Sequence, residues 1–164
     1  MRELLNTEVA IMQQFDHPGI MKLYDILESA NNIYLVMNFC SNGDMQAYMK
    51  KRGLAFFKEF EALQYLKQIG VIFKELHKKQ VMHRDFKLEN LFMNEENVLI
   101  GDFGLSKKGV QITTTWIGTP MYMAPEILQG KAYTNSADLW SVGVTFYEMI
   151  YGIFPFKGSN EKEL

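Results

Sequence analysis

Apolar residues recur at helical spacing in two parts of the chain. From Leu5 to Phe15 they lie three or four positions apart, and the sequence His-Pro-Gly at 17–19 then breaks the pattern. This predicts an amphipathic helix that ends near Asp16, and a longer stretch with the same spacing predicts a second helix. The apolar positions expected to face the core are Leu5, Val9, Met12 and Phe15 on the first helix, and Phe60, Leu63, Leu66, Ile69, Phe73 and Leu76 on the second.

Short apolar runs separated by polar residues are typical of β-hairpins. Residues 20–27 and 33–37 form one such pair, which Ser-Asn-Gly at 41–43 closes. Residues 91–93 and 98–100 form a second pair around a polar turn. The chain therefore predicts two hairpins placed before and after the long helix.

A third helix is predicted near the end of the chain. Asn135 or Ser136 is a suitable N-terminal cap, and Gly152 followed by Pro155 is a typical stop. We therefore expect this helix to span roughly the residues between these two signals.

Two acidic loops flank the second hairpin. Asp85 lies within His-Arg-Asp-Phe-Lys-Leu-Glu-Asn at 83–90, and Asp102 opens Asp-Phe-Gly at 102–104. A hairpin between the loops brings Asp85, Asn90 and Asp102 to one cleft. Their oxygen atoms suit Mg²⁺, and a free carboxylate suits a hydroxyl nucleophile, so the pattern indicates phosphoryl-transfer chemistry. Taken singly, each run is equally explained as a turn, because Asp and Asn are common turn residues.

Composition narrows the class of protein. Of the 164 residues 48% are hydrophobic and 22% are charged, which is typical of a folded domain. The net charge of −2 argues against a nucleic-acid-binding domain, and no apolar stretch is long enough to cross a membrane. Cys40 is the only cysteine, so no internal disulfide forms, and we expect a cytoplasmic or nuclear protein.

The motifs resemble those of the eukaryotic protein kinase family, serine/threonine type. After the two acidic runs come Gly-Thr-Pro at 118–120, Ala-Pro-Glu at 124–126 and a helix that contains Asp138, in the order of that family. Each tripeptide alone is a weak signal, but their order and spacing make coincidence improbable. The resemblance therefore supplies expectations for both fold and activity.

The resemblance implies an α+β, protein-kinase-like bilobal fold. Residues 1–37 would form a partial small lobe, made of a helix and a strand hairpin. Residues 38–44 would form the hinge, and 45–164 a mainly helical large lobe.

The resemblance also implies an enzyme that transfers the γ-phosphoryl group of ATP to Ser or Thr hydroxyls of a protein substrate, with Mg²⁺. Asp85 would orient the hydroxyl and accept its proton, and Lys87 would neutralise the charge of the transferring group. Asn90 and Asp102 would bind the metal. The positions assigned to the nucleotide and its metal are Glu8, Met37, Asn38, Phe39, Cys40, Asp44, Lys87, Glu89, Asn90, Phe92 and Asp102.

Several of these roles are specific. Glu8 would pair with the lysine that positions ATP, Met37 would guard the adenine pocket, the backbone of 38–40 would read adenine, and Phe92 would form part of the pocket floor. His83 would pack and hydrogen-bond beneath Phe103 rather than transfer a proton. Each position is also compatible with an ordinary surface or core residue. The positions with structural roles are Met12, Leu23, His83, Arg84, Phe103, Gly104, Glu126 and Asp138.

The threonines between the last motifs form the activation loop by resemblance: Thr113, Thr114, Thr115 and Thr119. Thr115 is the preferred target of an upstream activating kinase, with Arg84 pairing with the added phosphate; the alternative is an unmodified polar loop. Asp44, Glu89 and Glu148 match positions that contact basic residues before the phosphorylated Ser or Thr. These acids also suit simple solvation or helix ends.

The sequence departs from the family pattern at both ends. It has no glycine-rich loop and no strand carrying the lysine partner of Glu8, and it stops before the arginine partner of Glu126. We therefore expect exposed apolar surface on the first helix and a buried, unpaired Glu126, at a cost of about 3 to 5 kcal/mol. Phe86 and Leu88 replace the usual leucine and proline.

These departures leave an alternative function open, a truncated non-catalytic module that binds substrates or regulators of a kinase. A different class of nucleotide-binding enzyme is disfavoured, because the sequence has no Gly-x-x-x-x-Gly-Lys phosphate loop.

Overall fold

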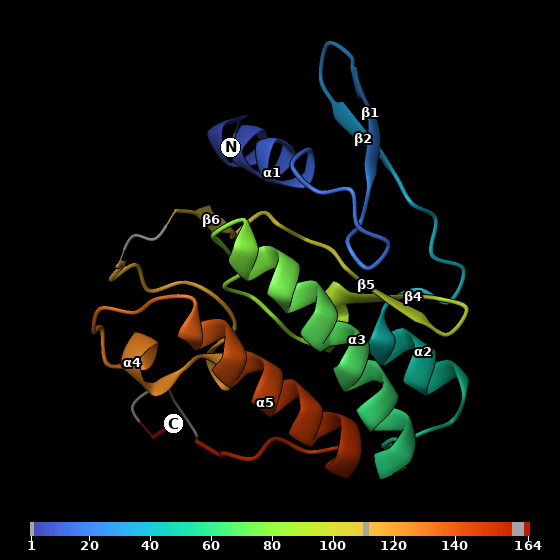
Figure 1. Cartoon of the computed structure of the whole chain (residues 1–164), viewed down its shortest axis with the longest axis vertical. Coiled ribbons are helices and arrows are strands. Elements are labelled where there is room, and N and C mark those ends of the chain that lie inside the picture. The colour runs from blue at the N-terminus through green and yellow to red at the C-terminus, as the bar shows by residue number, and fades with distance from the viewer. Residues whose placement is uncertain (1, 110–111, 159–162) are drawn as a thin grey trace.

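Figure 1 shows the computed structural model, which describes residues 2–109, 112–158 and 163–164, with side chains described from residue 5. The helix α1 (Arg2–Met12) and the hairpin of β1 (Leu23–Glu28) and β2 (Ile33–Met37) lie together at one end. The larger part contains α2 (Met45–Lys51), α3 (Glu59–Lys78), β3 (Val81–Met82), β4 (Leu91–Asn94), β5 (Asn97–Ile100), β6 (Lys107–Lys108), α4 (Pro125–Leu128) and α5 (Ser136–Tyr151), with 3-10 turns at Leu88–Asn90 and Pro120–Tyr122. The predicted mixture of helices and small sheets is confirmed.

Each of the three sheets among the described residues is a two-stranded antiparallel ladder. β1 pairs with β2, β4 with β5, and β3 with β6. Both predicted hairpins are confirmed, but the first strand begins at Leu23 rather than at residue 20. Ile20 instead forms a parallel bridge with Ile100, so the chain crosses to the end of β5 before it enters the hairpin. This crossing joins α1 and the β1–β2 hairpin to the end of β5, where the loop at residues 101–104 begins.

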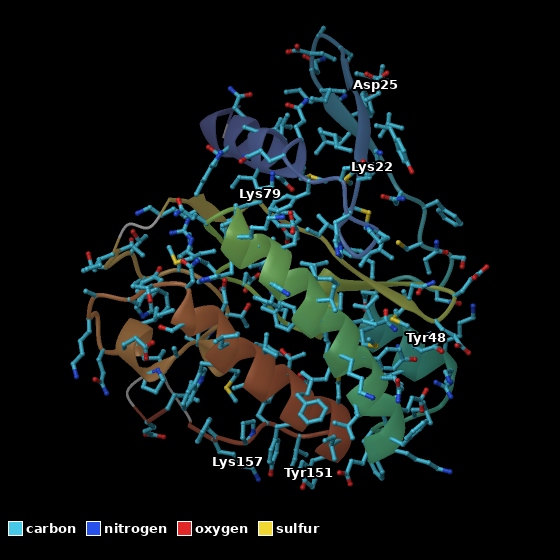
Figure 2. All side chains as sticks on the ribbon, in the orientation of Figure 1. Lys22, Asp25, Tyr48, Lys79, Tyr151 and Lys157 are labelled. Carbon is cyan, nitrogen blue, oxygen red and sulfur yellow. The ribbon has the colours of Figure 1, made fainter. Side chains whose placement is uncertain are left out.

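The predicted helix α1 is confirmed, but it ends at Met12 rather than near Asp16, and the apolar surface expected on it is not found. Met12 is buried and Leu5 is half-buried, because this face of the helix packs on the core, and Phe15, which follows the helix, is also buried. The ring of Phe15 stacks on Phe103 at 6.1 Å. The exposed apolar surface lies on the β1–β2 hairpin instead, where Tyr24 is 60% exposed. Figure 2 shows hairpin side chains standing clear of the remaining chain, around the labelled Asp25.

The long helix α3 is confirmed, but the predicted core face is wrong at its start. Phe60 is 75% exposed and Leu63 37% exposed. The buried stripe passes through Ala62, Tyr65, Ile69, Ile72 and Leu76, rotated from the predicted stripe in the first turns. Phe60 and Leu63 therefore do not mark the inner face, which at this end of the helix is formed by the small Ala62 and by Tyr65.

The helix α5 ends where the sequence predicts. Gly152 is its C-terminal cap with φ of 67°, and its N–H donates to the carbonyl of Glu148 at 2.8 Å. Asn135 occupies the N-cap position, but its side chain makes no capping bond; the predicted capping interaction is therefore wrong. Within the described residues, no helix combines the length and apolarity needed to cross a membrane.

Candidate active site

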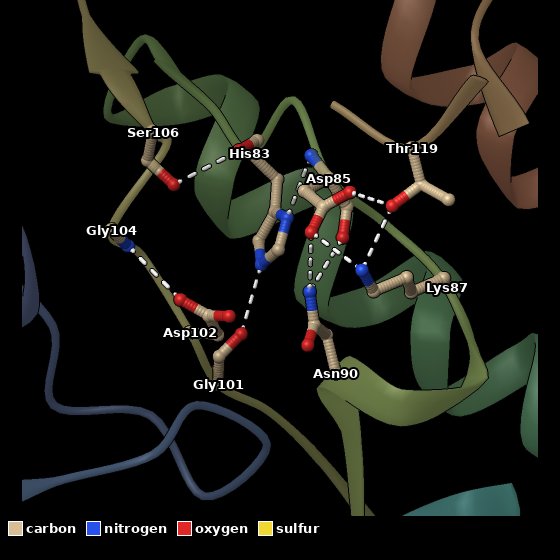
Figure 3. A network of polar contacts seen from close by, with 9 residues as sticks. All are labelled: His83, Asp85, Lys87, Asn90, Gly101, Asp102, Gly104, Ser106 and Thr119. Carbon is tan, nitrogen blue, oxygen red and sulfur yellow. Dashed lines mark hydrogen bonds and ion pairs between the residues drawn. The ribbon is translucent and has the colours of Figure 1, made fainter. Parts of the chain in front are cut away.

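Two loops meet at the end of the β4–β5 hairpin. One loop, residues 83–90, leads into β4, and the other, residues 101–104, leaves β5. Leu91 and Ile100 are cross-strand partners, and the N–H of Gly101 donates to the carbonyl of Asn90 at 3.1 Å. The hairpin therefore sets both loops side by side, as expected from the sequence (Figure 3).

The carboxylate of Asp85 is 8% exposed and is surrounded by donors. Thr119 donates to its Oδ1 at 2.7 Å, while Lys87 Nζ and Asn90 Nδ2 lie 2.9 and 3.2 Å from its Oδ2. Burial alone raises the pKa of Asp85, but the hydrogen bonds from Thr119 and Lys87 and the charge of Lys87 outweigh it, so the pKa lies below its ordinary value. Asp85 is therefore ionised at neutral pH.

Thr119 connects the activation loop to the loop at residues 83–90, which by resemblance is called the catalytic loop. Its hydroxyl accepts a hydrogen bond from Lys87 Nζ at 2.8 Å while it donates to Asp85. Because Lys87 also contacts Asp85, the three side chains form a closed triangle (Figure 3). The sequence places Thr119 in the activation loop but does not predict this bridging contact.

Asp138 and His83 hold the catalytic loop in place. The buried carboxylate of Asp138 accepts from the backbone N–H groups of His83 and Arg84 at 2.8 and 2.9 Å. His83 is fully buried, contacts the carbonyl of Gly101 through Nε2 at 3.0 Å, and lies 5.3 Å from the ring of Phe103. These contacts match the structural roles expected for the side chains and leave His83 without access to a substrate.

Asp102 presents a carboxylate at the edge of the site. Its backbone is left-handed with φ of 57°, its side chain is exposed, and its Oδ1 accepts from the N–H of Gly104 at 3.3 Å. Glu8 of α1 lies nearby: a Cβ added to Gly104 would be 3.3 Å from Asp102 Oδ1 and 3.7 Å from Glu8 Oε2. Burial raises the pKa of Glu8, and the negative charge of Asp102 raises it further. The pair therefore favours a cation between or beside its members.

Asn90 and Asp102 have donor atoms suited to Mg²⁺. The amide nitrogen of Asn90 donates to the carbonyl of Asp85 at 2.7 Å, which leaves its amide oxygen available as a ligand. No group of three or more His, Cys, Asp or Glu side chains in the described ranges is arranged to hold a metal. An amide and a carboxylate from the protein, completed by phosphate and water, is the sparse type of site that Mg²⁺ uses with nucleotides. The residues present therefore fit this ion.

The predicted adenine positions line the junction between the two parts of the chain. Met37 ends β2 and is 39% exposed, and Cys40 is half-buried, which raises the pKa of its thiol. Phe39 is 85% exposed. Phe92 packs on the loop after β5, where a Cβ at Gly101 would lie 2.7 Å from its ring.

Asp44 bridges to Phe92 through the backbone and caps α2 by accepting from the N–H of Ala47 at 2.8 Å. Leu23 is half-buried beside the core.

The three consecutive threonines of the activation loop differ in access. Thr113 is 5% exposed because its backbone pairs with Tyr133, whose hydroxyl also donates to the carbonyl of Thr115 at 2.7 Å. Thr114 and Thr115 are exposed. Arg84, with φ of 68°, donates through Nε to the carbonyl of Leu105 at 2.6 Å. The guanidinium of Arg84 is therefore already bound to the segment that follows Asp-Phe-Gly.

Two acids, Glu89 in the turn before β4 and Glu148 in α5, lie near Tyr122. Glu148 Oε2 accepts from the hydroxyl of Tyr122 at 2.6 Å, and burial raises the pKa of Glu148, although this hydrogen bond opposes the rise. Among the residues that the structure describes, Oε2 of Glu89 is buried without a hydrogen-bond partner, and the charge of Glu89 raises the pKa of both Tyr122 and Glu148. The sequence singles out the two acids but not Tyr122, although its place between two motifs offered a signal. A buried, unpaired carboxylate oxygen favours an incoming donor.

One structural expectation is wrong. Glu126 is only half-buried, because it lies in the first turn of the short helix α4 with access to solvent. The cost expected for an unpaired buried carboxylate at this position therefore does not apply.

Comparison with known proteins agrees with this geometry. The chain matches the protein kinase domain family over residues 1–164, and it belongs to that family. It is 31% identical to serine/threonine-protein kinase Nek5 of Homo sapiens over 168 residues, which cover 99% of this chain and 24% of that protein. It is 40% identical to serine/threonine-protein kinase atg1 of Dictyostelium discoideum over 159 residues (92% and 24%), and 40% identical to calcium-dependent protein kinase 5 of Plasmodium falciparum over 168 residues (99% and 29%). The chain thus spans about a quarter of the length of these relatives.

Proposed function

We propose that this chain supplies the catalytic centre of a serine/threonine protein kinase, which transfers the γ-phosphoryl group of ATP to a protein hydroxyl. The observation that carries the proposal is the closed contact of Asp85, Lys87 and Thr119 beside Asn90. Membership of the protein kinase family and the names of the relatives support the same reaction.

Asp85 acts on the attacking hydroxyl. As the hydroxyl oxygen bonds to the γ-phosphorus, the bond from that phosphorus to the bridging oxygen breaks, ADP leaves, and the hydroxyl proton passes to Asp85. The depressed pKa keeps Asp85 ionised and able to orient the hydroxyl beforehand. Lys87, held 2.9 Å from Asp85, stabilises the negative charge of the transferring group.

ATP and Mg²⁺ fit the remaining groups. Asn90 and Asp102 would hold the ion, whose role is to neutralise and orient the phosphates. The backbone of residues 38–40 would bind adenine, and Glu8 would pair with a cation that contacts the phosphates.

We further propose that the preferred substrates carry Arg or Lys before the phosphorylated residue. Glu89, whose buried Oε2 has no hydrogen-bond partner among the described residues, and the half-buried Glu148 support this, because their negative charges attract a guanidinium or ammonium group. Asp44 is the third acid assigned to this surface by resemblance.

The resemblance to the protein kinase family also leads to proposals for the regulation and the location of the protein. We propose Thr115 as the residue phosphorylated by an upstream kinase, since it is exposed whereas Thr113 is buried. Arg84 would then exchange its carbonyl contact for the phosphate. With a single cysteine, a cytoplasmic or nuclear location is proposed.

One peptide experiment tests the reaction and the substrate class together. The intact protein, with Mg²⁺ and γ-labelled ATP, is presented with matched peptides that contain Ser, Thr or Tyr, with and without basic residues before the acceptor. We expect label on Ser and Thr but not on Tyr, and faster labelling of the basic peptides.

Equal rates on basic and neutral peptides would overturn the substrate class alone. Absence of transfer to any Ser or Thr peptide, together with retained binding of a protein partner, would favour the non-catalytic module instead.

A further inference from the structure

The strand β1 contains an irregularity next to the adenine site. Leu23 pairs with Met37, but the next pair is Asp25 with Val36, so Tyr24 is an extra residue in β1. Such a bulge bends its strand and redirects a side chain. Here it lies one residue pair before the chain leaves β2 for the hinge.

The redirected side chain contacts the first hinge residue. The phenol oxygen of Tyr24 accepts from Asn38 Nδ2 at 3.1 Å. Asn38 Oδ1 accepts from the N–H of Lys22 at 2.6 Å, and the N–H of Asn38 donates to the carbonyl of Lys22 at 3.2 Å. Asn38 is thus fixed by three hydrogen bonds to two residues of the neighbouring segment, and Figure 2 labels Lys22 at the base of the hairpin.

These bonds leave the ligand-binding edge of the hinge available. Within the described part of the chain, no hydrogen bond occupies the carbonyl of Asn38 or the N–H of Cys40. The other end of the hinge is also held, because the N–H of Gly43 donates to the carbonyl of Cys40 at 3.1 Å. The segment is therefore anchored on both sides, with free peptide groups between the anchors.

We propose that Asn38 is a positioning residue for the nucleotide, and that its side chain, supported by the Tyr24 bulge, presets the hinge peptides for adenine. This inference rests on the proposed use of ATP. A preset hinge avoids the ordering cost that a free segment pays when a ligand binds. Asn38 acts through the backbone and does not itself touch the reacting atoms.

Three variants of the intact protein separate the contacts. Asn38→Ala removes both side-chain bonds. Asn38→Asp keeps an oxygen that accepts from Lys22 but cannot donate to Tyr24. Tyr24→Phe keeps the bulge and ring but removes the phenol oxygen. Asn31→Ala, in the turn of the same hairpin, is the matched control.

The readouts are KM for ATP, kcat, KM for a peptide substrate, and the Kd of adenosine measured by calorimetry. For Asn38→Ala we expect KM for ATP and Kd for adenosine to rise by about three- to tenfold, the size of one or two net hydrogen bonds, with kcat and peptide KM within about twofold. Asn38→Asp and Tyr24→Phe should each give a smaller rise, and Asn31→Ala none.

Outcomes separate the inference from the proposed function. If the unmodified protein binds adenosine and transfers phosphate, and Asn38→Ala leaves KM for ATP and Kd for adenosine unchanged, the inference is wrong. If Asn38→Ala lowers kcat and raises the peptide KM and the Kd of adenosine by similar factors, the variant has a general structural defect. This result would also overturn the inference. Failure of the unmodified protein to bind adenosine would refute the proposed use of ATP, and the inference with it.

Discussion

At the scale of single residues, the site depends on how the charge of Asp85 is maintained. Three donors surround a carboxylate that burial alone would favour in its neutral form. Donors stabilise the ionised form, so each donor lowers the pKa and removal of one must raise it. Thr119 is the donor that comes from outside the catalytic loop, which makes the activation loop part of the control of Asp85.

Replacement of Thr119 by Val should therefore change both rate and pH dependence. We expect kcat to fall by about tenfold, the value of one charge-assisted hydrogen bond, and the acid limb of the kcat profile to move to higher pH. Thr119→Ser, which keeps the hydroxyl, should restore both. An acid limb that does not move in Thr119→Val would show that this hydroxyl does not control the ionisation of Asp85.

At the scale of elements, two glycines near the ends of α2 and α5 adopt left-handed backbone angles. Gly152 ends α5 with φ of 67°, and a Cβ there would lie 2.5 Å from the carbonyl oxygen of Ala55. Gly53 has a nearly equal φ of 66° with nothing within 4 Å of the same added atom. The two glycines thus separate the cost of the backbone angle from the cost of the contact.

Substitution of each glycine by Ala tests this separation by urea unfolding of the intact protein. Gly53→Ala should lower the free energy of unfolding by about 1 to 2 kcal/mol, the usual cost of a left-handed residue. Gly152→Ala should lower it further, because the chain must also shift near Ala55, in total by about 2 to 4 kcal/mol. Equal losses in the two variants would mean that the close approach of Gly152 to Ala55, in the loop between α2 and α3, relaxes at no cost in free energy.

At the scale of the whole molecule, sequence patterns predicted what depends on local chemistry. The helices α1, α3 and α5, both hairpins and the stop at Gly152 follow from spacing and turn residues, whereas the short helices α2 and α4 were not predicted. The buried stripe of α3 did not, because Ala62 is chosen by packing against neighbours that the local pattern does not contain. The site motifs named Asp85 and Asp102, yet the contacts through Thr119 and Tyr24 join residues far apart in the chain.

In the proposed reaction, Asp85 is the group that receives the substrate proton. Asp85→Asn keeps the size of the side chain and removes its charge. Its kcat for phosphoryl transfer to a Ser peptide, measured in the intact protein beside the exposed control Asp25→Asn, is the most direct test. We predict a loss of about 10²- to 10⁴-fold with the Kd for ATP nearly unchanged, and no loss in the control. A kcat within about threefold of the unmodified protein would contradict the assignment of this site.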